Sequence, residues 1–282
     1  MAVRVKSCFF CLSDEYVPAI KGVRTMDMIG QRLFTGRVAV AQAALTFTRK
    51  LFANTKAYSD GKRCTMRGEE RNALSDVPQV SSFYFSYVWA ILLTSCFLPS
   101  QLAALYASAD EKLGAADAFV GGCEADLREC LIARTIPPDT LTRAIAVAKI
   151  RAVETSIALC HALKQEVGSY ALMWNTGFEN TDFLQCCKFA EGDSRILSQK
   201  LARDAFNEFV KNKGKAPGGW SRAEAGSCRR VAKIVASGTK AGMGKMAAWD
   251  SAWVDVYALA EAVCDRVVGE RTGGRGSARA RL

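Results

Sequence analysis

The sequence predicts an all-α protein, built as an antiparallel bundle of long helices. Runs with alternating Val, Ile and Thr are scarce, and the 282 residues contain only six prolines, so signals for strands and helix breaks are few. Apolar residues instead recur three and four positions apart over long stretches, which is typical of helices with one buried face. Half of the residues are hydrophobic and 23% are charged, which is the composition of a folded domain and not of a disordered chain.

The N-terminal half is expected to hold an extension, a long helix, a loop and two further helices. Residues 1–25 form the extension, and residues 26–58 carry apolar side chains at helical spacing. Gly, Asp, Arg and Pro gather over residues 59–78 and predict a loop. An apolar helix is expected over residues 80–108 and a shorter helix over residues 115–134.

The apolar helix lies in a stretch without charges that is long enough to cross a bilayer of ~30 Å. No charged residue stands between Asp76 and Asp110. However, Pro99, Gln101 and several serines interrupt the stretch, and no cluster of Lys or Arg flanks it. We therefore expect a helix buried within the bundle and no membrane span.

The central part of the chain predicts a second long helix and then a pair of helices. The segment PPDT at residues 137–140 opens the long helix, with Asp139 or Thr140 as the N-cap, and the helix is expected to continue to about Tyr170. The segment WNTGFEN breaks it, and residues 181–213 are again helical on both sides of the polar tripeptide Glu-Gly-Asp that starts at Glu191.

The C-terminal part predicts additional helices after a linker. The segment NKGKAPGG is rich in Gly and Lys and marks the linker, which separates a main helical domain over residues 26–213 from helices within residues 214–270. Those helices are expected over residues 221–237 and about 243–270. Residues 271–282 predict a basic disordered tail, because they contain no apolar pattern that would join a core.

Charge and cysteine usage narrow the possible partners. The net charge is +10, but the chain from Arg266 onward holds five arginines against one acid, so part of the excess belongs to the tail. Neither a basic stripe with aromatics nor a recognition motif is present, so we expect no nucleic acid. The eleven cysteines lack the spacing of a zinc site and His161 is the single histidine, which predicts no metal and mostly buried, reduced thiols.

Three segments resemble one enzyme family in their order and spacing. They are GQRLFTGRVAVAQAAL (30–45), QEVGS (165–169) and FAEGDSRIL (189–197). Together they are similar to the C-terminal helical domain of acyl-CoA dehydrogenases and acyl-CoA oxidases. The resemblance covers about residues 26–213 and implies FAD as cofactor, fatty acyl-CoA as substrate, and α,β-desaturation in lipid β-oxidation. It does not distinguish an oxidase from a dehydrogenase.

In this resemblance Glu191 matches the catalytic base of the family, which takes the α-proton of the acyl thioester. A base for such a weak acid is expected in an apolar site that raises its pKa, with walls from Phe183, Leu184, Phe189 and Ala190. The alternative is an exposed glutamate at the start of a helix, because short EGDS segments are typical of helix caps.

The resemblance implies further site residues on other helices. Arg37 matches a basic residue near the active site and is assigned to substrate binding, with a structural salt bridge as the alternative. His161 lies on a helical face and is expected to be a packed core histidine. The resemblance assigns these residues to FAD contacts, largely across a subunit interface: Lys62, Arg63, Gln79, Gln165, Gly168 and Gly192.

The chain departs from the family in its length. The family has an N-terminal helical domain and a β-domain before the helical domain, and residues 1–25 are too few to supply them. We therefore expect a homo-oligomer or a partner chain that supplies these parts, an incomplete gene product, or a helical module with a structural role. The ending Ala280-Arg281-Leu282 is similar to the peroxisomal address SKL, which predicts a peroxisome, with the matrix of mitochondria or another organelle as the alternative.

Overall fold

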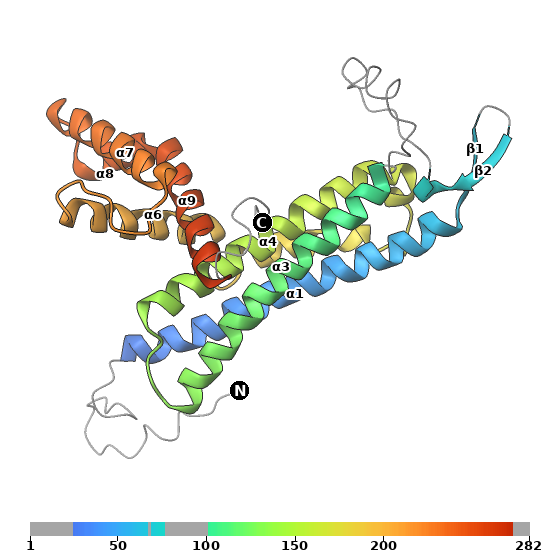
Figure 1. The fold of residues 1–282 in the computed structure, drawn as a ribbon, viewed down its shortest axis with the longest axis horizontal. Helices are drawn as coiled ribbons and strands as arrows, with labels where there is room; N and C mark the ends of the chain where they lie inside the picture. Colours follow the sequence, from blue (N-terminus) through green and yellow to red (C-terminus); the bar gives the residue numbers. More distant parts are fainter. Residues whose placement is uncertain (1–24, 67–68, 77–100, 273–282) are drawn as a thin grey trace.

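The computed structural model describes residues 25–66, 69–76 and 101–272, and over these residues the chain is all-α apart from one small hairpin (Figure 1). Three long helices form the main bundle: α1 (Thr25–Gly61), α3 (Gln101–Ile132) and α4 (Asp139–Glu166). The expected all-α bundle is confirmed. The sequence expectations for residues 1–24, 77–100 and 273–282, including Gln79 and the C-terminal tripeptide, lie outside the described residues.

The direction of the three helices follows from their side-chain contacts. Arg49 Nη1 of α1 lies 3.2 Å from Asp117 Oδ1 of α3, and Gln42, earlier in α1, donates to Glu124, later in α3. These two helices are therefore antiparallel. The α1 and α4 helices run parallel, because Thr48 contacts Cys160 and the ring of Tyr58, further along α1, stacks on the ring of Tyr170 just beyond α4.

The core of the bundle is filled by small and branched side chains at helical spacing. In α4 nearly every residue from Ala144 to Val153 is buried, which places this helix at the centre of the bundle. Its neighbours α1 and α3 contribute buried residues on one face each. The apolar residues of α1 and α3 form one stripe each, because only one face of these helices is covered. Those of α4 are nearly continuous, because this helix is covered on most sides.

The second group of helices follows the break after α4, where two 3-10 helices, η3 (Gly168–Leu172) and η4 (Phe178–Asn180), turn the chain. Figure 1 shows this group beside the bundle. Its members are α6 (Ser194–Lys211), α7 (Arg222–Lys240), α8 (Lys245–Ser251) and α9 (Trp253–Arg271), whereas the short helix α5 (Asp182–Phe189) packs against α1 and α4 of the bundle. Ion pairs join α9 to the bundle: Arg151 of α4 lies 2.7 Å from Glu261 and 2.6 Å from Asp265.

Four local expectations are wrong. The loop over residues 59–78 contains an antiparallel hairpin, β1 (Arg63–Met66) and β2 (Glu69–Ala73), followed by the 3-10 helix η2 (Leu74–Asp76). The helix expected to begin at Ala115 is part of the continuous α3. Neither Asp139 nor Thr140 caps α4, whose N-cap is Pro138 without a side-chain hydrogen bond. The helix over residues 243–270 is broken at Ala252 into α8 and α9.

The described cysteines are all free thiols, and most of them are buried. Burial raises the pKa of Cys123 and Cys160 to about 11 and that of Cys228 and Cys264 to about 12, so these thiols are protonated at neutral pH. Within the part of the chain that the structure describes, no group of three His, Cys, Asp or Glu side chains is placed to hold a metal ion. No helix there has the length and apolar character needed to cross a membrane.

Candidate functional site

The turn between α5 and α6 carries Glu191 on an unusual backbone. Glu191 has φ 56 and Gly192 has φ 100, so both lie in the left-handed region, which costs an ordinary L-residue about 1 kcal/mol or more. Asp193 then caps α6, because its Oδ1 accepts a hydrogen bond of 2.6 Å from Arg195 N. The expected helix break is confirmed, and the capping role belongs to Asp193.

The side chain of Glu191 lies against α1. A methyl group built on Gly36 would overlap the carboxyl carbon of Glu191 and approach both carboxylate oxygens to 2.6 Å, so the carboxylate sits over a part of α1 that has no side chain. The next residue, Arg37, donates from Nε to the backbone oxygen of Glu191 at 3.0 Å. Burial lowers the pKa of Arg37, and the negative charge of Glu191 opposes that shift. Acid and cation therefore face each other at the seam between α1 and the turn.

Lys149 of α4 is a site residue that the sequence analysis missed. Its side chain is fully buried, and Nζ donates to Lys188 O at 2.5 Å, to Gly192 O at 2.9 Å and to Ser194 Oγ at 3.1 Å. One signal for it was present, because Lys149 interrupts an apolar run in the middle of the helix. A buried lysine in such a place needs partners for all its N–H groups.

The expected apolar walls do not close around Glu191 together. Leu184 is buried in the core, whereas Phe189 is 61% exposed and Ala190 is exposed. Phe183 is 42% exposed and packs its ring 5.7 Å from the ring of Phe47 of α1. The described residues thus provide a partly open seam around the acid.

A groove of about 410 Å³ opens beside Arg37, between the start of α4 and α6. Its lining includes Arg143 and Lys211 as well as Asp139 and Glu208, so cations and acids are mixed. Glu191 is not part of this lining. The groove therefore adjoins the candidate base through Arg37 and does not contain it.

The residues assigned to FAD phosphates lie at the other end of the bundle. Lys62 and Arg63 are exposed where α1 leads into the hairpin. Gln165 and Gly168 are exposed at the end of α4, and Gly168 has φ 60. Because α1 rises about 1.5 Å per residue, the 24 residues from Arg37 to its end place Lys62 and Arg63 about 36 Å from the seam. Within one chain the structure does not bring them to Glu191.

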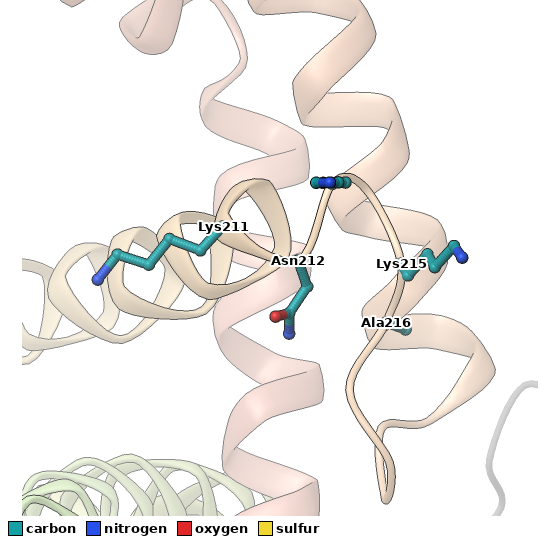
Figure 2. A pocket seen from close by; sticks show the side chains of 5 residues that line it. Lys211, Asn212, Lys215 and Ala216 are labelled. Atoms are coloured by element: carbon teal, nitrogen blue, oxygen red, sulfur yellow. The ribbon is translucent and has the colours of Figure 1, made fainter.

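Two further cavities do not extend the site. His161 is exposed and lines a cavity of about 150 Å³ together with Cys160 and Lys164, so the expectation of a packed core histidine is wrong. A hollow of about 330 Å³ follows the end of α6. Figure 2 shows the side chains of Lys211 and Lys215 pointing away from each other there, so the hollow does not gather their charges on one point.

The comparisons with known proteins agree with the fold. Neither a protein-family profile nor a curated protein matches the sequence. Among solved structures, acyl-CoA oxidase 1 of Arabidopsis thaliana matches with a TM-score of 0.60 and 14% identity over 93% of this chain. Acyl-CoA oxidase 3 of Yarrowia lipolytica matches with a TM-score of 0.55 and 15% identity over 94% of this chain.

These matches extend past the range in which the sequence alone suggested a likeness. Residues 26–213 are about two thirds of the chain, so a coverage of 93% includes helices after the linker. The chain in turn covers 41% of the Arabidopsis oxidase and 42% of the Yarrowia oxidase. Over its described length the chain therefore has the fold of the helical part of acyl-CoA oxidases.

Proposed function

We propose that this chain supplies the helical part of a flavin-dependent site that desaturates a fatty acyl-CoA between its α and β carbons. The observation that carries the proposal is the placement of Glu191. Its carboxylate lies on a half-buried seam of an acyl-CoA oxidase-like fold, beside the cation Arg37 and on a turn fixed from two sides. A base must be held in this way if it is to reach one particular C–H bond.

Each residue at the seam has a defined part in this proposal. Glu191 takes the α-proton of the acyl thioester on its carboxylate. Arg37 holds the backbone oxygen of Glu191 and binds the substrate side of the seam. Gly192 is assigned to the approach of a flat ring to the backbone, on a face other than the one where Arg37 and Leu197 lie 3.6 Å and 3.7 Å from the position of a Cβ. The chemistry that bound FAD would supply at this seam is that of an acceptor for the hydride from the β carbon.

The residues at the hairpin end fit the phosphate-bearing part of FAD by their chemistry. Lys62 and Arg63 are exposed cations, which suit a pyrophosphate, and Gln165 offers an amide. A side chain added at Gly168 would meet nothing within 4 Å, so the backbone there is open to a ligand. Because this end lies about 36 Å along α1 from the seam, we propose that it serves a flavin bound by a second copy of the chain or by a partner chain.

The same proposal includes the parts that an active enzyme would need. The chain spans about two fifths of the solved oxidases that it matches. An N-terminal helical domain and a β-domain would therefore come from another chain or from a longer gene product. The tripeptide Ala280-Arg281-Leu282 supports a peroxisomal location.

An absorbance spectrum of the purified chain, with and without a long-chain acyl-CoA, tests the proposal. We expect bands of bound flavin that bleach when the acyl-CoA is added. Replacing Lys62 and Arg63 together with Gln should reduce bound flavin, whereas the matched pair Lys240→Gln and Lys245→Gln, both at exposed positions away from the seam, should not. Glu191→Gln should keep the flavin and lose the bleaching. A chain that binds no flavin, alone or with the partner that purifies with it, contradicts the proposal.

A second candidate is a helical module without catalytic activity that holds a larger complex together. The observation in its favour is an exposed apolar segment after α4, where Leu172 is 81%, Met173 60% and Trp174 80% exposed. Apolar side chains of this size usually face a partner when they are contiguous on a surface. A colourless, tightly associated oligomer in sedimentation experiments, dissociated by Leu172→Ser with Trp174→Ser, would support this function.

A further inference from the structure

Lys149 is the largest fully buried side chain among the described residues. Its neighbours on α4, including Val147 and Ile150, are buried apolar residues, so nothing in the helix pattern calls for a cation at this position. A charge in such surroundings is costly unless it is fully hydrogen-bonded. The benefit must therefore lie in the groups that Lys149 contacts.

Those groups bracket Glu191 along the chain. Lys188 O belongs to the last turn of α5, Gly192 O directly follows Glu191, and Ser194 Oγ belongs to the first residue of α6. An ammonium group has three N–H donors, and here each has an acceptor. One buried atom of α4 thus binds the entry, the middle and the exit of the turn that carries the candidate base.

The charges around Lys149 come from α4 itself, from α1 and α5, and from the N-cap of α6. Burial is the main influence and lowers the pKa of Lys149 to about 8. Asp193 at the N-cap of α6, Glu154 of α4 and Cys187 of α5 favour the charged form, while Arg37 of α1 disfavours it. Arg37 is also the residue that binds the backbone oxygen of Glu191 from the other side.

We propose that Lys149 is a positioning residue that fixes the backbone of Glu191 between α4 and α1. On one side Lys149 holds the flanking carbonyls, and on the other side Arg37 holds the oxygen of Glu191 itself. The two anchors together keep the left-handed backbone that turns the carboxylate toward Gly36. The consequence for catalysis rests on the proposed function, whereas the positioning of the turn is a property of this chain that is measured without flavin or substrate.

The principal variant is Lys149→Met, which fills the same space but has no donors. Its matched control is Lys188→Met, which removes a lysine side chain from the same turn. The Lys188 side chain pairs with Glu154 at 2.8 Å, and its backbone oxygen, the acceptor for Lys149, remains in the control. Both variants are made in the full chain.

The first measurement follows hydrogen exchange of the amides within the turn. Ala190 N bonds to Cys186 O and Leu197 N bonds to Asp193 O, both at 2.9 Å. Losing the bonds to a buried cation should speed exchange of these two amides by about 10- to 100-fold in Lys149→Met. Exchange in the middle of α3 should not change, and Lys188→Met should resemble the wild type. Equal acceleration throughout the chain would overturn the proposal, because it would show a loss of core stability only.

The second measurement uses the Nε–H resonance of Arg37, which reports its hydrogen bond to Glu191 O. In the wild type this resonance should shift as pH passes through about 8, because the neutral amine of Lys149 keeps only two N–H donors for three acceptors. In Lys149→Met the shift near this pH should be absent. A shift of the same size and midpoint in the variant would overturn the proposal.

Ser194→Ala keeps the test decisive if Lys149→Met does not fold. This variant removes one acceptor of the ammonium and leaves the apolar core unchanged, so the charged form of Lys149 should become less favourable. The midpoint of the Arg37 titration should then move to lower pH, and an unchanged midpoint would contradict the proposal. If the exchange and titration results are as expected but the chain binds no flavin, Lys149 is a positioning residue and the proposed enzymatic function is wrong. If the chain binds flavin but these results are not obtained, only the proposed role of Lys149 is wrong.

Discussion

At the residue scale, Gly36 decides where the carboxylate of Glu191 lies. Replacing a glycine in a helix interior by alanine usually stabilises a protein by about 0.5–1 kcal/mol. In Gly36→Ala we expect this gain to be reduced or lost, because the new methyl group displaces the Glu191 carboxylate. Chemical denaturation of both proteins measures the difference.

Gly114→Ala in α3 is the control for this prediction, since a methyl group there meets nothing within 4 Å. It should show the full gain in the free energy of unfolding. In a Glu191→Ala background Gly36→Ala should recover the gain as well. If Gly36→Ala equals Gly114→Ala in the wild-type background, the carboxylate does not rest on α1.

The lowered pKa of Lys149 also predicts how stability depends on pH. The pKa is about 8 in the folded chain and 10.5 ordinarily, so between these values the unfolded state binds more protons. The free energy of unfolding of the wild type, relative to Lys149→Met, should therefore rise as pH increases from about 8 to about 10.5. The rise over the whole window should be about 3 kcal/mol, measured as the difference between urea denaturation curves of the two proteins. A constant difference across this window would contradict the shift.

At the scale of elements, a buried ion pair joins α7 to α9. Arg266 approaches both carboxylate oxygens of Glu224, at 2.8 Å and 3.1 Å, and the side chain of Glu224 is fully buried. Removing the Glu224 carboxylate leaves the largely buried Arg266 with only the exposed Glu270 as an ionic partner. Glu224→Gln should therefore lower the free energy of unfolding by about 3 kcal/mol.

The second partner of Arg266 provides the control. Glu270 lies 2.8 Å from Arg266, but its side chain is 55% exposed. Glu270→Gln should cost no more than about 0.5 kcal/mol in thermal or urea unfolding. If the two substitutions have the same effect, burial is not what makes the Glu224 contact important.

The boundaries of helices and strands were predictable from the sequence only in part. The long helices α1 and α4 follow from unbroken helical spacing of apolar residues. The hairpin could not be predicted in this way, because its paired residues, such as Thr65 with Glu70, are largely polar and give no alternation of apolar side chains. The sequence analysis left residues 109–114 between two expected helices, whereas α3 runs through them, because an exposed glycine such as Gly114 is tolerated inside a long helix.

The candidate site was predictable only in part, for a related reason. A local motif placed Glu191 and Gly192 at a helix break, and the structure confirms that break. Lys149 stands 42 residues before Glu191, and no local pattern connects them. Gly36 was equally invisible, because its importance lies in what packs over it. Contacts between distant helices are set by tertiary packing, which periodicity does not encode.

At the scale of the whole molecule, Arg151 fastens the C-terminal helices to the bundle. Its side chain is only 12% exposed and contacts Glu261 and Asp265 of α9. Arg151→Met should increase hydrogen exchange across α9 by about 3- to 10-fold, because a charge-assisted contact with partly exposed partners contributes about 1 kcal/mol. Added salt should reduce the difference between variant and wild type.

Arg49→Met is the comparison for this prediction, since Arg49 pairs with Asp117 within the bundle. It should leave exchange in α9 unchanged. If both variants increase hydrogen exchange in α9 equally, the ion pairs of Arg151 are not what holds α9 against α4.

The parallel course of α1 and α4 has a consequence for how related chains can change in length. Arg37 and Lys149, Thr48 and Cys160, and Tyr58 and Tyr170 are each 112 positions apart, and the last two pairs are in direct contact. A single inserted residue turns the rest of a helix by about 100°. All later residues of that helix would then point away from their partners on the other helix. A relative that gains or loses a residue between the first and last of these contacts in α1 should carry a compensating change in α4, whereas the hairpin and the linker are free to vary.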